Sequence, residues 1–293
     1  MSNSAPPASE VRPLSAREFE QIRRLAYRQF GLDLRNGKEQ LVSARLGRQI
    51  RELKFRSFQE YYRHVVEDRT GEALVALIDA LTTNHTSFFR EPVHFEFLRR
   101  TILPGLRARD RIAVWSAACS TGEEPYSIAF CLVEELGETA LAKIRILATD
   151  ISTRVLAAAG QGVYPAERFD GIPGVQLRRC LLRGEGRFHG WYRVKPELRA
   201  TVEFRRLNLM EGFSHLGPFP VIFCRNVMIY FDKATQQDLV NRMAACLEPG
   251  GYLLIGHAES LNAIDNPLEY VCPAVYRKPG QGGPASERER ARR

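Results

Sequence analysis

Hydrophobic and polar positions follow two different periods along the chain, and the period changes after residue 81. Up to that point apolar residues recur at intervals of three or four, as they do on one face of a helix. This part predicts four helices, at residues 16–30, at 37–53, after the N-capping residue Ser57, and at 74–81. Four short helices of this kind predict a small all-α N-terminal domain.

Beyond residue 110, short apolar runs alternate with helical stretches, which is typical of strands buried in a mostly parallel sheet. We expect strands at residues 111–117, 144–149, 202–207, 220–225, 251–257 and 274–278, and helices at about 93–101, 124–136, 152–160 and 233–247. The predicted fold is an α/β, doubly wound, Rossmann-like sheet. The segment between 160 and 202 is too long for a plain crossover, and its alternating run at 188–194 predicts a small inserted β-subdomain at about 164–200.

These elements divide the chain into five stretches. We expect a flexible leader at 1–13, a helical domain at 14–81, a connector at 82–92, a sheet domain at 93–279 and a flexible tail at 280–293. In the connector, the aromatic pair Phe88 and Phe89 is expected to act as an anchor. The neighbouring polar residues Asn84, Thr86 and Arg90 would then face a cleft.

The turn after the first strand predicts the kind of ligand. A dinucleotide-binding turn carries three glycines, whereas this one has Gly122 among small residues, which disfavours a pyrophosphate and favours a nucleoside carrying an amino acid. The bend of this strand-to-helix elbow is expected to let the ligand approach the backbone closely. Glu123 and Glu124 would repel phosphates and could hold an ammonium group or ribose hydroxyls. Alternatively, both are carboxylates favoured in a first helical turn by the helix dipole.

Further polar residues follow the other predicted strands, where ligands of such sheets bind. Asp150 is a candidate acceptor for ribose hydroxyls, or else the N-cap of the next helix. Asn208 either reaches the same crevice or forms a turn. Asn226 and Tyr230, after the predicted central strand, are candidates for direct ligand contact.

Composition excludes some classes of protein. With 44% hydrophobic and 26% charged residues, and apolar runs shorter than the roughly 20 residues of a membrane span, the chain reads as an ordinary globular protein that we expect in the cytoplasm. Six scattered cysteines without a C-x-x-C pair predict buried, reduced thiols and no metal site. The net charge of +8 favours acidic partners, and the absence of a nucleic-acid motif disfavours nucleic acid.

Residues 82–91, 114–128, 148–151 and 222–232 together closely resemble the chemotaxis receptor methyltransferases of the CheR family, in the family's order. The resemblance runs from about residue 15 to 278. It implies an all-α domain, then a methyltransferase sheet that binds S-adenosyl-L-methionine and carries a small β-subdomain. The implied reaction methylates glutamate side chains in the cytoplasmic helical region of chemoreceptors and leaves S-adenosyl-L-homocysteine. The enzyme would be a monomer without membrane insertion.

Carried over by position, the resemblance also implies the site residues. The implied cofactor residues are Asn84, Thr86, Arg90, Glu124, Asp150, Asn208, Leu209, Arg225 and Asn226, with Glu123 as the alternative to Glu124. Arg90 and Tyr230 match the positions that the family associates with catalysis.

The second predicted helix carries a further candidate surface. Val42, Leu46, Ile50 and Leu53 define an inward stripe. Arg48 and Arg51 lie opposite, flanked by Arg45 and Lys54, and an acidic receptor helix could dock there. The alternative is a solvated basic face.

Two other functions stay open at this point. The chain could be a non-catalytic signalling adaptor that binds S-adenosylmethionine, or a methyltransferase of the same fold that acts on another acceptor. A nicotinamide oxidoreductase is disfavoured because the glycine pattern is wrong.

Overall fold

The computed structural model describes residues 12–280 except 36 and 84, and its chain forms two compact units. The helical unit extends from the N-terminal region to residue 84 and includes Tyr230–Asp232. The sheet unit comprises the rest. The predicted leader at 1–13 and tail at 280–293 lie almost entirely outside the described residues.

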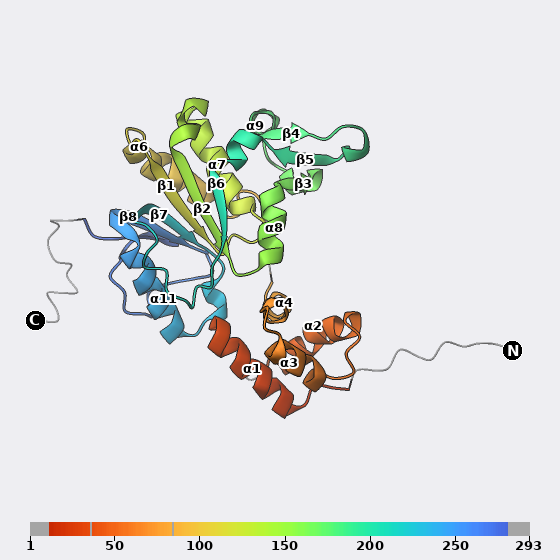
Figure 1. Ribbon diagram of the computed structural model, residues 1–293. Coiled ribbons are helices and arrows are strands. Elements are labelled where there is room, and N and C mark those ends of the chain that lie inside the picture. The colour runs from red at the N-terminus through yellow and green to blue at the C-terminus, as the bar shows by residue number, and fades with distance from the viewer. Residues whose placement is uncertain (1–11, 36, 84, 281–293) are drawn as a thin grey trace, which may run out of the picture. The chain divides into compact units, whose positions relative to one another are not determined.

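The helical unit contains α1 (Ala16–Phe30), α2 (Glu39–Glu52), α3 (Phe58–Glu67) and α4 (Glu72–Leu81), as Figure 1 shows. A capping box between Ser15 and Glu18 begins α1, and Gly31 ends it in the left-handed conformation, with φ of 69°. The Ser57 side chain accepts a hydrogen bond from the Glu60 backbone N–H and so caps α3 as predicted. Every helix limit of this unit that was predicted by residue number lies within two residues of the observed limit.

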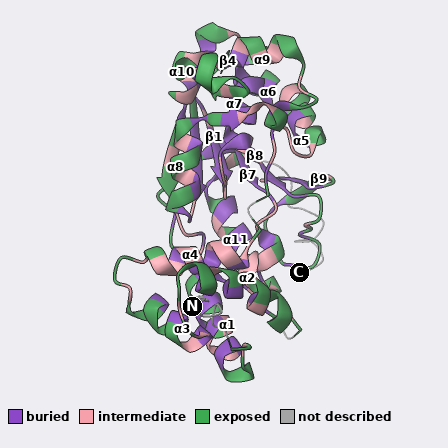
Figure 2. Cartoon of the chain, turned by 90° about the vertical axis from the view of Figure 1, so that its right-hand side faces the viewer, coloured by how far each residue is buried: buried purple, intermediate pink, exposed green. Residues whose placement is uncertain are grey.

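The core of the helical unit includes three positions of the predicted stripe on α2. Val42, Leu46 and Ile50 are fully buried, in the interior that Figure 2 colours purple. The prediction was wrong for Leu53, whose exposed fraction is 53%. Leu53 is the C-cap residue of α2, so the chain leaves the helical period there and the side chain turns away from the core.

Tyr230–Asp232 joins the helical unit although these residues are distant from it in sequence. Phe231 forms an antiparallel bridge with Leu32, and the Asp33 backbone N–H donates to the Tyr230 carbonyl oxygen at 2.8 Å. The Tyr27 hydroxyl donates to the Asp232 carboxylate at 2.8 Å. The residues that follow the predicted central strand are therefore anchored among the helices.

The sheet unit is built on a seven-stranded sheet of order β6-β2-β1-β7-β8-β10-β9. Its strands are β1 (Ile112–Ala117), β2 (Ile144–Asp150), β6 (Val202–Arg206), β7 (Phe219–Cys224), β8 (Leu247–Ile255), β9 (Glu269–Cys272) and β10 (Val275–Arg277). The first five are parallel, while β9 and β10 are antiparallel. The doubly wound fold is confirmed, and β1 and β7 are its adjacent central strands.

Helices surround this sheet. They are α5 (Pro92–Phe97), a π-helical turn (Leu98–Ile102), α6 (Leu103–Leu106), α7 (Glu123–Leu136), α8 (Thr153–Gln161), α10 (Pro196–Arg199) and α11 (Lys233–Ala245). The predicted single helix at 93–101 is in fact a longer helical stretch, because the π-turn joins α5 to α6. Helices α7 and α8 pack against β2, and α11 packs against β8.

One predicted strand begins elsewhere. β8 starts at Leu247 rather than at 251, so residues 248–250 lie within the strand as well. Gly250 has φ of 80°, and its N–H donates to the Lys278 carbonyl oxygen at 2.9 Å. The register with β7 shifts at this point, which lets a Pro-Gly-Gly segment remain in the sheet.

The predicted β insertion is confirmed as a three-stranded antiparallel sheet of order β3-β5-β4. It comprises β3 (Val163–Pro165), α9 (Gly174–Cys180), β4 (Leu181–Arg183) and β5 (Trp191–Val194). All six cysteines are free thiols, and five of them are buried, as predicted, whereas Cys272 is half-buried. Across the described part of the chain, every helix is too short or too polar to cross a bilayer.

Candidate functional site

The strand order reverses between β1 and β7, and the carboxyl ends of the parallel strands near this point carry most of the predicted site residues. β1 is followed by an elbow in which Ala118, Ser120 and Gly122 are all left-handed, with φ of 61°, 49° and 95°. A Cβ atom on Gly122 would lie 2.8 Å from the Ala159 Cβ and 2.9 Å from the Tyr164 hydroxyl oxygen. Gly122 is therefore required for packing and for its own φ, a role that the sequence did not predict.

Asp150 ends β2 and links two loops. Its Oδ2 accepts a hydrogen bond from the Ser120 backbone N–H at 2.8 Å, and its Oδ1 accepts one from the Ser152 N–H at 3.0 Å. The N-cap of α8 is Ser152, whose side chain accepts from the Val155 N–H. Asp150 is thus not the helix cap, and its carboxylate is held at the strand end by backbone donors.

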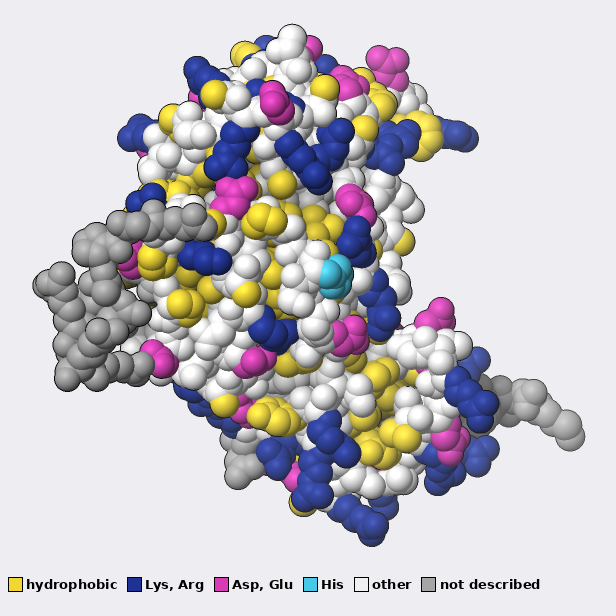
Figure 3. Space-filling model, turned by 60° about the vertical axis from the view of Figure 1, so that its left-hand side comes forward, with side chains coloured by type: hydrophobic (Ala, Val, Ile, Leu, Met, Phe, Trp, Pro, Cys, Tyr) yellow, Lys and Arg dark blue, Asp and Glu magenta, His cyan; other side chains and the backbone are white. Residues whose placement is uncertain are grey.

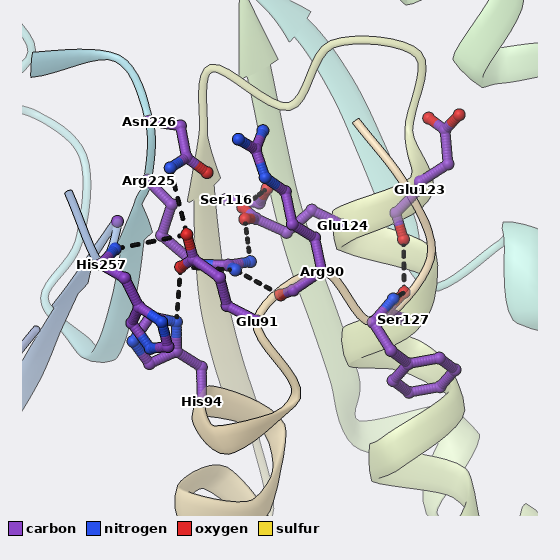
Figure 4. Close-up of polar contacts among 12 residues, drawn as sticks. Arg90, Glu91, His94, Ser116, Glu123, Glu124, Ser127, Arg225, Asn226 and His257 are labelled. Atoms are coloured by element: carbon purple, nitrogen blue, oxygen red, sulfur yellow. Dashed lines mark hydrogen bonds and ion pairs between the residues drawn. The ribbon is translucent and has the colours of Figure 1, made fainter. Parts of the chain in front are cut away.

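A buried arginine connects the other strand ends. The Arg225 side chain, just after β7, is 2% exposed and lies between two carboxylates, as Figure 4 shows. Its guanidinium donates to Glu124 Oε2 at 2.9 Å and to Glu91 Oε2 at 3.0 Å, and it also donates to the Arg90 carbonyl oxygen. The other Glu124 oxygen accepts from the Ser116 hydroxyl at 2.7 Å.

Glu91, at the end of the connector, was absent from the predicted site. Its Oε1 accepts from the Asn226 side-chain amide at 3.2 Å and from the His257 backbone N–H at 3.3 Å. Burial raises the pKa of Glu91, but the charge of Arg225, together with hydrogen bonds from Arg225, Asn226 and the His257 backbone, outweighs burial and leaves the pKa below its usual value. Glu91 is therefore ionised at neutral pH.

Glu259, which follows β8, was also missed. Its Oε2 accepts from the backbone N–H groups of Asn226 at 3.0 Å and Gly256 at 2.6 Å, and its Oε1 accepts from the Ile229 N–H at 3.2 Å. Burial raises its pKa, against the lowering effect of these N–H groups. The carboxylate holds the turn in which Asn226 has φ of 59°. Glu259 could have been found by extending the strand-end argument to β8, whereas Glu91 follows no strand and carried no such signal.

The connector follows the pattern predicted for its aromatic pair. Phe88 is buried against Phe130 and Phe169, and Phe89 packs on Phe95 with ring centroids 5.2 Å apart. Arg90 follows Phe89 in the chain and is half-buried. Its guanidinium donates to the His85 carbonyl oxygen at 2.7 Å. Both anchoring rings thus fix the backbone on which Arg90 stands.

The remaining predicted residues occupy distinct surroundings. Glu123 is 1% exposed and lies beside Arg168, with 3.6 Å between the charged atoms, while Glu124 alone of this pair contacts Arg225. Thr86 is buried, and its carbonyl oxygen accepts from Arg168 at 3.1 Å. Asn208 Oδ1 accepts from the Met210 N–H at 3.0 Å, which makes the turn that was its alternative role.

Some candidates lie outside this strand-end cluster or outside the described residues. Leu209, after Asn208, is buried, and Asn84 is not among the described residues. Tyr230 belongs to the helical unit, where its hydroxyl accepts from the Thr83 N–H at 3.0 Å and donates to the Thr83 carbonyl oxygen at 3.2 Å.

The predicted arginines of α2 differ in their contacts. Arg45 donates to the Leu81 carbonyl oxygen and to the Thr83 hydroxyl, so its guanidinium ties α2 to the end of α4. Arg48 is exposed and pairs with Glu52 at 2.9 Å, and Arg51 is exposed. Figure 3 shows many Lys and Arg side chains, in dark blue, on the surface of the helical unit.

Two histidines lie against Glu91. His94 is fully buried, its ring centroid is 4.7 Å from that of His257, and its Nδ1 is 3.4 Å from Glu91 Oε2. The possible ligand atoms of these three residues lie within 4.8 Å of one another, a spacing that a metal ion could use. However, the Arg225 guanidinium is 3.0 Å from the same Glu91 oxygen, and its positive charge disfavours a cation there.

The chemistry of this cluster suits a particular ligand. Asp150 places a carboxylate near the switch point of the sheet, where backbone N–H groups hold it, and Asn226 adds an amide. Glu124 adds a second carboxylate whose charge is partly balanced by Arg225. Carboxylates repel phosphate and attract ammonium groups and hydroxyl donors. The site therefore fits an amino-acid-bearing nucleoside.

Comparisons with known proteins match nearly the whole described chain to one family. The family described as "CheR methyltransferase, SAM binding domain" matches residues 84–275, and "CheR methyltransferase, all-alpha domain" matches residues 17–82. "Chemotaxis protein methyltransferase 2" of Pseudomonas aeruginosa is 46% identical over 260 residues, which are 88% of this chain and 92% of that protein. "Chemotaxis protein methyltransferase" of Escherichia coli is 41% identical over 264 residues, or 90% and 91% of the two chains.

The buried histidine yields a prediction about pH. Burial, with the nearby charge of Arg225, lowers the pKa of His94 to about 4 from 6.5. Between pH 4 and 6.5 the unfolded chain binds a proton on His94 that the folded chain does not bind, so acidification favours the unfolded chain. The contribution of neutral His94 to the free energy of unfolding is therefore fully present above pH 6.5 and is lost as pH falls toward 4. The slope from one proton approaches about 1.4 kcal/mol per pH unit.

Unfolding in urea from pH 4 to 7 would measure this effect. The free energies of unfolding of wild-type protein and His94→Gln should differ by an amount that changes between pH 4 and 7. Wild type should lose stability more steeply on acidification. His189→Gln, which removes an exposed histidine, is the control. Parallel curves for wild type and His94→Gln would show that His94 takes up its proton equally in both states.

Proposed function

The chain belongs to the CheR methyltransferase family, and we propose from this membership that it methylates glutamate side chains of chemoreceptors to give glutamyl methyl esters. Its cofactor is S-adenosylmethionine and the product is S-adenosylhomocysteine. The observation that carries the proposal is the match of both family domains together with relatives that are named chemotaxis protein methyltransferases. We further propose that the enzyme acts as a monomer in the cytoplasm, on the helical region of the receptor.

The strand-end cluster would hold the cofactor. We assign its hydroxyl and ammonium groups to the carboxylates of Asp150 and Glu124, and we include Asn226 as an amide contact. The other assigned contacts are Asn84, Thr86, Arg90, Asn208, Leu209 and Arg225. Glu124 is chosen over Glu123 because Glu124 shares the Arg225 cluster, whereas Glu123 lies beside Arg168. When bound, the cofactor supplies an electrophilic methyl group on a positively charged sulfur.

The residues of this chain then have to position the acceptor rather than activate it. A glutamate is already ionised at neutral pH, so a strong general base is unnecessary. Alignment of the acceptor oxygen and exclusion of water can supply much of the acceleration. We assign Arg90 and Tyr230 to this positioning. A tight bidentate pair with Arg90 would lower the nucleophilicity of the acceptor, so a looser contact is expected.

Two alternatives remain testable. A signalling adaptor would bind the cofactor without turnover, and the presence of both Arg90 and Tyr230 favours an enzyme over an adaptor. A methyltransferase of the same fold could use a different acceptor. The exposed Arg48 and Arg51 favour an acidic protein partner over a neutral small molecule.

The chemistry of the product separates these functions. We expect that incubation with methyl-labelled S-adenosylmethionine and candidate receptors labels the receptor, and that mild alkali then releases the label as volatile methanol. Carboxyl esters hydrolyse under these conditions, whereas N-methyl groups do not. Label that resists alkali would exclude the glutamyl ester. Cofactor binding without label in any receptor would support the adaptor.

The role of Tyr230 can be separated from cofactor binding. If its hydroxyl positions the acceptor, Tyr230→Phe should lower kcat roughly tenfold, the loss expected for one hydrogen bond of about 1.4 kcal/mol, and leave S-adenosylhomocysteine affinity within about twofold. Steady-state kinetics and calorimetry would measure both. Because the hydroxyl also bonds to the Thr83 backbone, an equal loss of affinity would instead assign Tyr230 to holding the connector.

The basic face of α2 makes a prediction about association. Arg48→Glu/Arg51→Glu should leave the helical unit folded, since both side chains are exposed. Receptor methylation should fall roughly tenfold or more at low ionic strength, because steering of the acidic partner is lost. The difference from wild type should shrink with added salt, which screens charges over about 8–10 Å.

The matched control is Arg100→Glu/Arg111→Glu in the sheet unit. It makes the same change in net charge, and Arg100 pairs with Glu96 four residues away as Arg48 pairs with Glu52. Methylation should be measured against ionic strength for all three proteins, with cofactor affinity and melting temperature alongside. If the two double variants behave alike, only overall charge matters and recognition lies elsewhere.

A further inference from the structure

The carboxylate of Glu91 stands among assigned cofactor residues without being one of them. Glu91 is the N-cap residue of α5, with φ of 57°, and its side chain is 15% exposed. Both of its oxygens contact strand-end residues: Oε2 faces Arg225, and Oε1 accepts from Asn226 and His257. A buried carboxylate with this many donors fixes the groups that donate to it.

Its contact with Asn226 determines which way that amide faces. The amide nitrogen donates to Glu91, so the amide oxygen points away from Glu91, as Figure 4 shows. A reversed amide would place its oxygen against an ionised carboxylate, which is repulsive. Glu91 thus selects the orientation in which Asn226 offers an acceptor to a ligand.

Its contact with Arg225 extends this effect across the site. The same guanidinium that contacts Glu91 donates to Glu124 Oε2 at 2.9 Å and to the Arg90 carbonyl oxygen. Without the Glu91 charge, Arg225 would be left with one carboxylate in a buried position. One side chain therefore sets the positions of an amide and, through Arg225, of a second carboxylate.

We propose that Glu91 is a positioning residue of the cofactor site, which orients the Asn226 amide and holds Arg225 against Glu124. This inference rests on the proposed function, since it concerns the S-adenosylmethionine site. Glu91 itself is not assigned a contact with the cofactor.

Three variants test the proposal. Glu91→Gln keeps the size of the side chain and removes its charge, and we expect S-adenosylhomocysteine to bind about tenfold or more weakly, the loss typical of a charged hydrogen bond. The KM for S-adenosylmethionine should rise in parallel, with a smaller change in kcat. Asn226→Asp should lose more, because it places a second carboxylate where the amide lies 3.2 Å from Glu91.

The exchange variant Glu91→Gln/Asn226→Asp is decisive. It restores an amide facing a carboxylate with donor and acceptor exchanged, so it should bind S-adenosylhomocysteine at least fivefold more tightly than Asn226→Asp alone. The exchange variant still tests the proposal if Glu91→Gln alone does not fold. Glu96→Gln, on the exposed side of α5 beside Arg100, is the control and should match wild type.

The outcomes distinguish this inference from the proposed function. Melting temperature and binding below the melting range should be measured for every variant. If wild-type protein does not bind S-adenosylhomocysteine, the proposed function fails. If wild type binds it, the proposal for Glu91 is overturned either when folded Glu91→Gln binds like Glu96→Gln or when the exchange variant is no better than Asn226→Asp.

Discussion

The burial of Arg225 is the constraint on which the site depends. A guanidinium that is 2% exposed costs several kcal/mol to desolvate unless carboxylates and hydrogen bonds compensate. Its two partners, Glu91 and Glu124, come from the connector and from the start of α7, while Arg225 itself follows β7. Three segments far apart in sequence must therefore meet before the charge can be buried. Loss of one partner would leave a charge uncompensated, so the cluster assembles as a whole.

The backbone around this ion-pair cluster adopts uncommon conformations that other contacts hold in place. Phe89, Glu91, Ser120 and Asn226 are non-glycine residues with positive φ, each a conformation that costs about 1–3 kcal/mol. The anchored rings, the Asp150 bonds to the elbow and the Glu259 bonds to the Asn226 turn hold these conformations. Contacts within the chain thus orient the acceptors of the site. Such preorganisation lowers the entropy that binding would otherwise cost.

Regular patterns were predictable from sequence, and tertiary contacts were not. Buried strands are continuous apolar runs, and the rule that ligands bind at their carboxyl ends pointed to Asp150 and Asn226, which the structure does place at the end of β2 and after β7. Glu91 escaped this argument because it follows no strand and reaches the site only through the fold. The packing role of Gly122 was not predictable, since only the fold places Ala159 where a Cβ on Gly122 would be. Leu53 kept the helical spacing after the helix had ended.

Two opposite electrostatic requirements explain why a protein of net charge +8 has an acidic ligand site. A sulfonium cofactor with an ammonium group is attracted by carboxylates, whereas an acidic acceptor is attracted by arginines. If both sets of charges were mixed at one surface, they would neutralise each other's field within a Debye length of about 8–10 Å. The chain instead keeps its carboxylates largely shielded from solvent at the strand ends and exposes Arg48 and Arg51 on α2. Burial strengthens the short-range attraction for the cofactor, while exposure lets the basic face act at longer range on the proposed acceptor.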